Sequence, residues 1–124
     1  MTGPIFDTHA HYSAHAFDAD RFALLDSLPA KGVVGVCEQA THSGDAPRVL
    51  ELAHRYPWVV AAIGIHPESL LAPEDCGADG PAPTVSVYGG DWAAEMRVLA
   101  PYYDDPKVVA LGEYGLDYHW PVPK

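Results

Sequence analysis

Two histidines near the start of the chain, His9 and His11, have the spacing of a metal-binding pair. In an extended strand, side chains two positions apart project from the same face, so both imidazoles can reach one cation. Asp7 shares that face and can orient a ligand from behind. A His-x-His pair alone is more often a solvated strand end. Asp7, together with a carboxylate at the end of a later strand, favours a metal site.

That later carboxylate is Glu113, which follows an apolar run and lies between Gly112 and Gly115. A carboxylate in this position is partly desolvated and needs a cation or a hydrogen-bond donor. The alternative is a salt-bridged Glu in a turn. We predict a metal ligand, with Glu113 also taking part in catalysis.

Three further polar residues lie near the expected strand ends. His66 precedes Pro67, which restrains it to extended geometry, and it can contact a substrate phosphate or bond a loop carbonyl structurally. Asp117 can orient a ligand, contact substrate or close a turn. Glu38 ends the second apolar run, where a side chain can reach a pocket, and Cys37 beside it is expected to be a buried small hydrophobe.

The chain alternates between two kinds of segment. Short apolar runs predict strands at 4–8, 32–37, 58–64 and 107–113, and helical spacing predicts helices at 19–28, 46–56 and 91–103. Strands separated by helices imply a parallel sheet with right-handed crossovers. A doubly wound sheet and part of a TIM barrel both fit this order. In either fold the polar residues named above meet at the carboxyl ends of the strands, where ligands bind.

Composition narrows the class of protein. The chain has 124 residues, 48% hydrophobic and 19% charged, as expected for one globular domain, and its net charge is −10. An acidic surface disfavours a broad nucleic-acid groove, but bound divalent metal can reverse the sign inside a small phosphoester pocket. Two isolated cysteines, Cys37 and Cys76, favour a reducing cytoplasm, and no run is long enough for a membrane span. Residues 72–90, rich in Pro, Gly and Ala, predict a long loop, placed to lie over the mouth of the site.

Three motifs, FDTHAHY, GIHPE and GEYGLDYHW, occur in that order and together resemble the N-terminal signatures of the TatD family of hydrolases and DNases. The resemblance implies a TIM barrel related to the amidohydrolases, two divalent metal ions (Mg²⁺, Mn²⁺ or Zn²⁺), and hydrolysis of ester bonds, best known for DNA. Nucleic acid or a small phosphodiester is then the expected substrate. By motif match, His9 and His11 bind one metal and Glu113 bridges both. His66 lies on the substrate side, and Asp117 is the Asp of the family's GLD motif.

The chain is shorter than the barrel fold of that family requires. A (β/α)₈ barrel usually needs about 250 residues, so we expect residues 1–124 to be a partial domain, the N-terminal half of the barrel with an insertion-like loop at 72–90. Such a half-site predicts weak metal binding and low or absent turnover. Open strand edges predict self-association. Two alternatives remain: an amidohydrolase-like enzyme acting on amides or lactones, and a non-catalytic half-barrel that dimerises or binds metal structurally.

Overall fold

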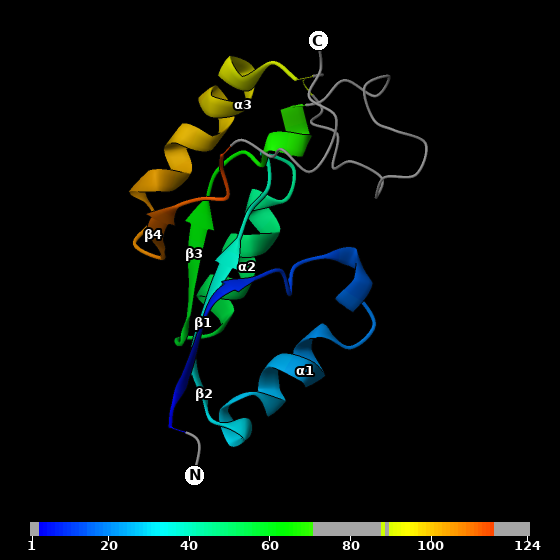
Figure 1. Ribbon diagram of the computed structural model, residues 1–124, viewed down its shortest axis with the longest axis vertical. Helices are drawn as coiled ribbons and strands as arrows, with labels where there is room; N and C mark the ends of the chain where they lie inside the picture. Colours follow the sequence, from blue (N-terminus) through cyan, green and yellow to red (C-terminus); the bar gives the residue numbers. More distant parts are fainter. Residues whose placement is uncertain (1–2, 71–87, 89, 116–124) are drawn as a thin grey trace.

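The computed structural model describes residues 3–70, 88 and 90–115, and its elements alternate between strand and helix (Figure 1). In chain order they are β1 (Ile5–Ala10), α1 (Arg21–Ser27), β2 (Val33–Gln39), α2 (Ala46–Arg55), β3 (Val59–Ile63), α3 (Trp92–Leu99) and β4 (Val108–Leu111). The predicted order of strands and helices is therefore confirmed.

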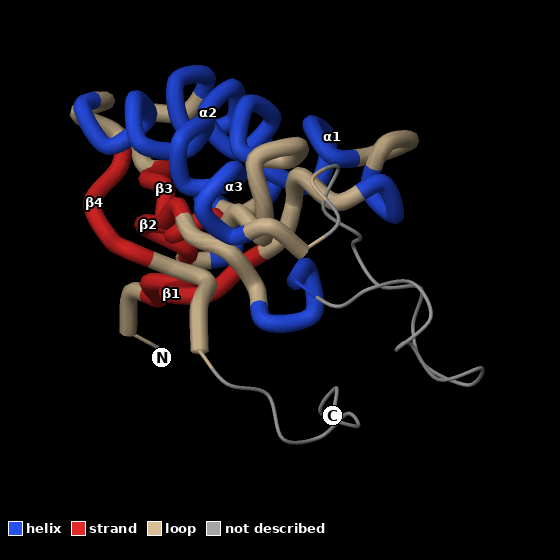
Figure 2. The backbone as a smooth tube through the Cα atoms, turned by 90° about the horizontal axis from the view of Figure 1, so that it is seen from above, coloured by secondary structure: helices blue, strands red, loops and turns tan. Residues whose placement is uncertain are grey.

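The four strands form one parallel sheet in the order β1-β2-β3-β4. Helices α1, α2 and α3 lie on the same face of this sheet (Figure 2). A doubly wound fold reverses its strand order and places helices on both faces. Strands in sequential order with helices on one face are instead an arc of a (β/α) barrel, which decides between the two architectures left open by the sequence.

The hydrophobic core fills the layer between the sheet and the helices. Helix α2 contributes the stripe Val49, Leu52 and Ala53, all buried, and it packs on β3 and β2. Val36 of β2 and Val59 of β3, which pair in register, face this layer and are at most 1% exposed. Burial of this stripe is what fixes the helix against the strands and thereby places the strand ends.

Local chemistry sets where the helices stop. Tyr56 caps α2 in an extended conformation (φ −116°, ψ 119°) because the next residue, Pro57, disfavours the helical region. After α1, Pro29 opens a 3₁₀ turn that ends at Gly32, whose φ of 91° suits a residue without a Cβ. Both ends return the chain directly to the next strand.

Element boundaries differ from the predicted ones in ways that matter for the site. Strand β1 runs to Ala10 and includes His9, and β2 runs to Gln39 and includes Glu38. Strand β4 is shorter than expected and ends at Leu111, so Glu113 lies two residues beyond it. Polar residues extend the first two strands because parallel pairing, rather than side-chain polarity, decides where a strand ends.

The third helix is also shorter than predicted. Helix α3 ends at Leu99, and Ala100–Asp104 forms a 3₁₀ turn with Pro101 in its first positions. Trp92, a bulky aromatic that would ordinarily be expected in the core, is 63% exposed at the start of α3. The predicted loop at 72–90 lies outside the described residues except for 88 and 90.

Candidate metal centre

Strand β1 delivers the two histidines. His9 lies in the strand and His11 directly follows its last residue, Ala10, which pairs with Glu38 of β2. The two imidazole rings meet edge to face with centroids 5.1 Å apart, and their Nε2 atoms are 3.1 Å apart. The same-face projection predicted from their spacing is therefore present.

Glu113 follows β4, which lies at the opposite edge of the sheet from β1, and its side chain reaches the two histidines. The backbone N–H of Gly112 donates to the carbonyl of Ile63 at 3.0 Å, and that of Glu113 donates to the carbonyl of Ala40 at 3.1 Å. Gly64 makes room for this segment, because a Cβ there would stand 2.6 Å from the Glu113 carbonyl oxygen. The ends of β2 and β3 thus hold the short segment that carries the carboxylate.

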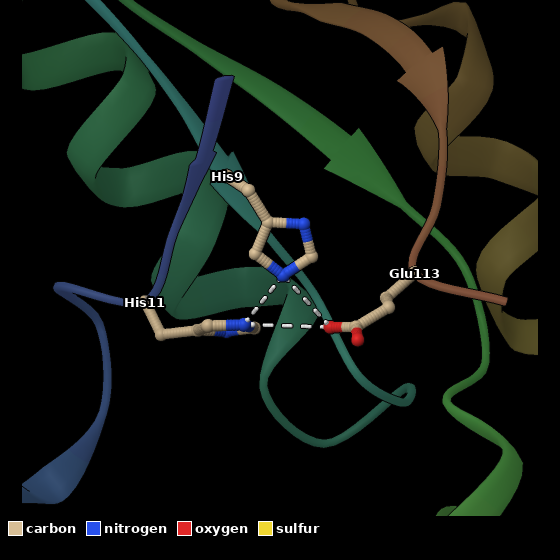
Figure 3. A group of neighbouring side chains, drawn as sticks. All are labelled: His9, His11 and Glu113. Carbon is tan, nitrogen blue, oxygen red and sulfur yellow. Dashed lines mark hydrogen bonds and ion pairs between the residues drawn. The ribbon is translucent and has the colours of Figure 1, made fainter. Parts of the chain in front are cut away.

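His9, His11 and Glu113 form a triangle of ligand atoms (Figure 3). Oε2 of Glu113 lies 3.4 Å from Nε2 of each histidine. Metal–ligand bonds of about 2.1 Å in tetrahedral geometry set ligand atoms about 3.4 Å apart, which matches these separations. The side chains are 53%, 39% and 25% exposed respectively, so a cation keeps access to solvent and substrate. Two imidazoles and one carboxylate are a donor set that fits a divalent metal.

His66 occupies the other side of the Glu113 carboxylate. Its Nε2 lies 3.3 Å from Oε1 of Glu113. Its Nδ1 accepts the backbone N–H of Glu68 at 3.1 Å, so the proton of the neutral ring is assigned to Nε2. The backbone N–H of His66 donates to the Thr41 carbonyl at 2.7 Å, and this hydrogen bond anchors the residue to the loop after β2. His66 therefore offers an N–H donor beside the triangle.

Asp7 touches the centre through the backbone. Its Oδ1 accepts the N–H of His9 at 3.1 Å. The contact restrains the strand just where the first histidine leaves it. That Asp7 orients a metal ligand stays a prediction.

The turn after His11 is held by a buried carboxylate. Glu38 is fully buried, and its Oε1 accepts the backbone N–H of Ser13 at 2.5 Å. Desolvation by burial raises the pKa of Glu38, while hydrogen bonds from the turn oppose that rise. Its Oε2 has no hydrogen-bond partner among the described residues. Glu38 follows Val36 by two residues in β2 and so shares its face of the sheet, which packs on the helices, and it is not part of the metal triangle.

Arg21 holds the carbonyl side of the same turn. Its Nε donates to the Tyr12 carbonyl at 2.6 Å, and its Nη2 donates to the carbonyls of Ser13 and Ala14 at 3.0 and 2.7 Å. Burial, with the nearby Asp7 and Glu38 carboxylates, raises the pKa of Tyr12. Donors and acceptors from two later elements thus fix the backbone that follows His11.

The structure brings together four of the residues predicted for the site: His9, His11, Glu113 and His66. Asp117 lies outside the described residues. Reasoning from sequence missed the roles of Arg21 and Glu38 in holding the turn. For Glu38 a signal existed, namely a carboxylate at the end of a β-branched run, where it must find donors if it is buried.

Comparison with known proteins agrees with this geometry. The family model described as TatD related DNase matches residues 6–124. Deoxyribonuclease TATDN3 of Homo sapiens is 32% identical over 115 residues, covering 92% of this chain and 38% of the relative. The uncharacterized metal-dependent hydrolase YjjV of Escherichia coli (strain K12) is 35% identical over 111 residues, covering 90% and 37%. The 3'-5' ssDNA/RNA exonuclease TatD of Cronobacter turicensis is 28% identical over 115 residues, covering 93% and 37%.

A solved structure shows the same architecture. The crystal structure of YJJV, a TatD homolog from Escherichia coli K12, superimposes with a TM-score of 0.69 at 28% identity, covering 92% of this chain and 38% of that one. The described residues thus form an arc of a (β/α) barrel with a His-His-Glu triangle at its strand ends. The chain belongs to the TatD family. It spans about 38% of the length of the relatives it matches.

No helix among the described residues combines the length and apolar character needed to cross a membrane.

Proposed function

We propose that the chain carries part of the active site of a divalent-metal-dependent hydrolase that cleaves phosphodiester bonds, most directly those of DNA. The observation that carries this proposal is the triangle of His9, His11 and Glu113, whose ligand atoms all lie within 4.8 Å of one another. Relatives named as deoxyribonucleases and as an exonuclease for single-stranded DNA and RNA support nucleic acid as the substrate class. They favour it over the amides and lactones of the alternative.

The roles proposed for the residues follow from their geometry. His9 and His11 would hold a divalent cation together with Glu113. Glu113 would also help to hold a second cation, for which the described residues form no second group of three ligands. When bound, divalent metal supplies a hydroxide nucleophile at neutral pH and stabilises charge on the phosphoryl oxygens.

His66 acts on the substrate in this proposal. Its Nε2–H, which faces Glu113 Oε1 at 3.3 Å, can turn its hydrogen bond to a phosphate oxygen that arrives beside the carboxylate. Pro67 and the bond from Glu68 keep the ring from rotating away. Asp117, which matches the GLD motif, is proposed as a further catalytic residue on sequence grounds alone.

Because the described residues supply three ligands for a two-metal site, we expect turnover by this chain to be slow. The test is cleavage of a fluorescent single-stranded oligodeoxynucleotide at high protein concentration with Mg²⁺, Mn²⁺ or Zn²⁺. Metal-dependent product that disappears in Glu113→Gln, and persists in the exposed control Glu51→Gln, supports the hydrolase. A chain that binds metal but gives no product over days contradicts catalysis by this chain and favours the non-catalytic half-barrel.

Self-association is a second proposal, made from the edges of the open sheet. On β4, Val109 and Leu111 are 60% and 69% exposed, and on β1, Ile5 and Phe6 are 46% and 53% exposed. Exposed apolar strand edges pair readily with other chains, so a second copy of the chain is the proposed occupant. Light scattering during size exclusion is expected to show a dimer or larger species that Leu111→Lys weakens. A monomer at every concentration contradicts the proposal.

A further inference from the structure

A cavity of about 400 Å³ adjoins the metal triangle. It lies between the turn that follows β1 and the loop that follows β2, and His11 forms part of its wall. Six other polar residues line it: Ser13, His15, Thr41, His42, Asp45 and Arg48. The triangle and the cavity therefore share the side chain of His11, which places them next to each other.

Positive charge gathers beside this cavity in a chain whose net charge is −10. Arg21 and Arg48 both donate through Nη2 to the same oxygen of Asp18, each at 2.6 Å. One carboxylate balances one guanidinium, so Asp18 by itself does not neutralise both arginines. The hydrogen bond from His15, followed by that from Arg21, holds the pKa of Asp18 well below its usual range. The arginines are thus tethered with their orientation set and their charge incompletely neutralised.

Asp45, the acidic residue in the cavity wall, already accepts hydrogen bonds from its neighbours. Asp45 accepts the backbone N–H of Thr41 at 3.0 Å, its hydroxyl at 2.6 Å and the N–H of His42 at 3.1 Å. The lining therefore presents mainly donors to a ligand. Nδ1 of His42 accepts the Gly44 N–H at 2.8 Å, which assigns the proton of the neutral ring to Nε2. Arg48 contacts the exposed ring of His15 through Nη1, 2.9 Å from Nε2, and the exposed carboxylate of Asp18 through Nη2 at 2.6 Å. A phosphate that replaces one of these exposed partners would meet the donor geometry that suits it.

We propose that this cavity binds a phosphate of the nucleic-acid strand, namely the one next to the scissile phosphate. Arg48 and His42 are the hydrogen-bond donors to it. The inference rests on the proposed function, since it assumes a scissile phosphate at the metal triangle. Contacts to neighbouring phosphates position a strand without reading its sequence. Such a contact lets an otherwise acidic protein hold a nucleic acid at one place and not along a broad groove.

The experiment compares two probes with the intact chain in the presence of Mn²⁺. One is thymidine 5′-monophosphate, and the other is a 5′-phosphorylated thymidine trinucleotide with hydrolysis-resistant phosphorothioate linkages. We expect the trinucleotide to bind about tenfold more tightly, the factor that one good ionic contact supplies. Arg48→Ala should bring the two affinities together, whereas Arg97→Ala, which removes an exposed charge on α3, should not. His42→Gln, a milder change, should reduce the ratio in part.

The outcomes separate this inference from the proposed function. Mn²⁺-dependent binding of the monophosphate with no added affinity for the trinucleotide overturns the phosphate subsite alone. An equal loss in Arg48→Ala and Arg97→Ala also overturns it, because general charge then explains the binding. Monophosphate binding that ignores Mn²⁺, with the Arg48-dependent ratio intact, supports the subsite and contradicts the metal site. Absence of binding by either probe contradicts both. Unchanged Mn²⁺ affinity and unfolding temperature in Arg48→Ala show that the variant is folded.

Discussion

His66 and Glu113 meet at a single pair of atoms: Nε2 of the histidine lies 3.3 Å from Oε1 of the carboxylate. The other oxygen, Oε2, faces His9 and His11 at 3.4 Å. The two oxygens of one carboxylate thus have different neighbours, a nitrogen that carries a proton on one side and two metal-binding nitrogens on the other. This division assigns different expected effects to otherwise similar histidine substitutions.

His66→Ala should leave Mn²⁺ affinity within about tenfold of that of the unchanged chain. A tenfold loss is the lower end of the range seen when a group that supports a metal ligand is removed. Binding of thymidine 5′-monophosphate should weaken more than metal binding does, because the lost N–H is a substrate donor. Electron paramagnetic resonance of free Mn²⁺ measures the first affinity and calorimetry the second. Metal affinity that falls as far as in His9→Ala would assign His66 to the metal ligands instead.

Glu38 gives a prediction about the turn after His11. Glu38→Ala leaves the Ser13 N–H without its acceptor, and should lower the free energy of unfolding by about 1–3 kcal/mol. Glu38→Gln keeps an acceptor oxygen and should be far milder. Because burial raises the pKa of Glu38 above 4.5, the folded state holds the proton more tightly. Its contribution to stability therefore falls as pH rises above 4.5 through the raised pKa, and Gln should abolish that slope.

Urea unfolding of both Glu38 variants at pH 4.5 and pH 8 measures these effects. Mn²⁺ affinity should fall in Glu38→Ala and recover in Glu38→Gln, which separates positioning of His11 from general stability. Equal damage by the two substitutions would show that the charge of Glu38 matters, and not its role as acceptor.

Gly64 marks the close approach of two strand ends. A Cβ at this position would lie 2.6 Å from both the Glu113 carbonyl oxygen and the Gly112 carbonyl carbon, so Gly64→Ala must displace the segment that carries the ligand. We expect a loss of about 1–3 kcal/mol, as for other overpacked sites, together with weaker metal binding. Gly3→Ala is the matched control, since nothing lies within 4 Å of its Cβ position. Equal unfolding temperatures for the two variants would contradict the close contact.

We expect Asp18 to account for part of the loss of folding stability at low pH. Its hydrogen bonds to His15, Arg21 and Arg48 hold its pKa well below the ordinary 3.8. Stability from this group is therefore complete above pH 3.8 and is lost as pH falls below that value towards the lowered pKa. Asp18→Asn should flatten the decline in urea midpoint between pH 5 and pH 2.5, and Asp104→Asn should not. Parallel curves for Asp18→Asn and the unchanged chain would disprove this account of acid unfolding.

Much of the fold could be predicted from the sequence because its periodic signals were strong. Two strands were predicted from the apolar runs around Val36 and Val59, and helix α2 from the stripe of Val49 and Leu52. The barrel was predicted from the motifs. The helix ends at 99 and 104 could not be predicted, because α and 3₁₀ turns differ little in local preference. Trp92 could not be placed either, since exposure depends on which neighbours cover it.

The site was predictable in its ligands but not in their supports. His9, His11 and Glu113 could be found because residue type and spacing alone suggest metal binding. Arg21 and Glu38 act through backbone groups of Tyr12 and Ser13, and such contacts depend on tertiary structure. The single partial domain over 1–124, the cytoplasmic location and the number and identity of the metals stay predictions.

Isothermal calorimetry with Mn²⁺ and with Zn²⁺ measures whether His9, His11 and Glu113 bind a cation. The variants are His9→Ala, Glu113→Gln and the control His54→Ala, whose ring pairs with Asp105 at 2.7 Å at the end of α2. We expect saturable binding of at least one ion per chain. This binding should be retained in His54→Ala and weakened by more than a hundredfold in the other two variants, beyond the effect of a supporting group. Absence of binding by the unchanged chain, or equal binding by His9→Ala, would contradict a metal centre at these residues.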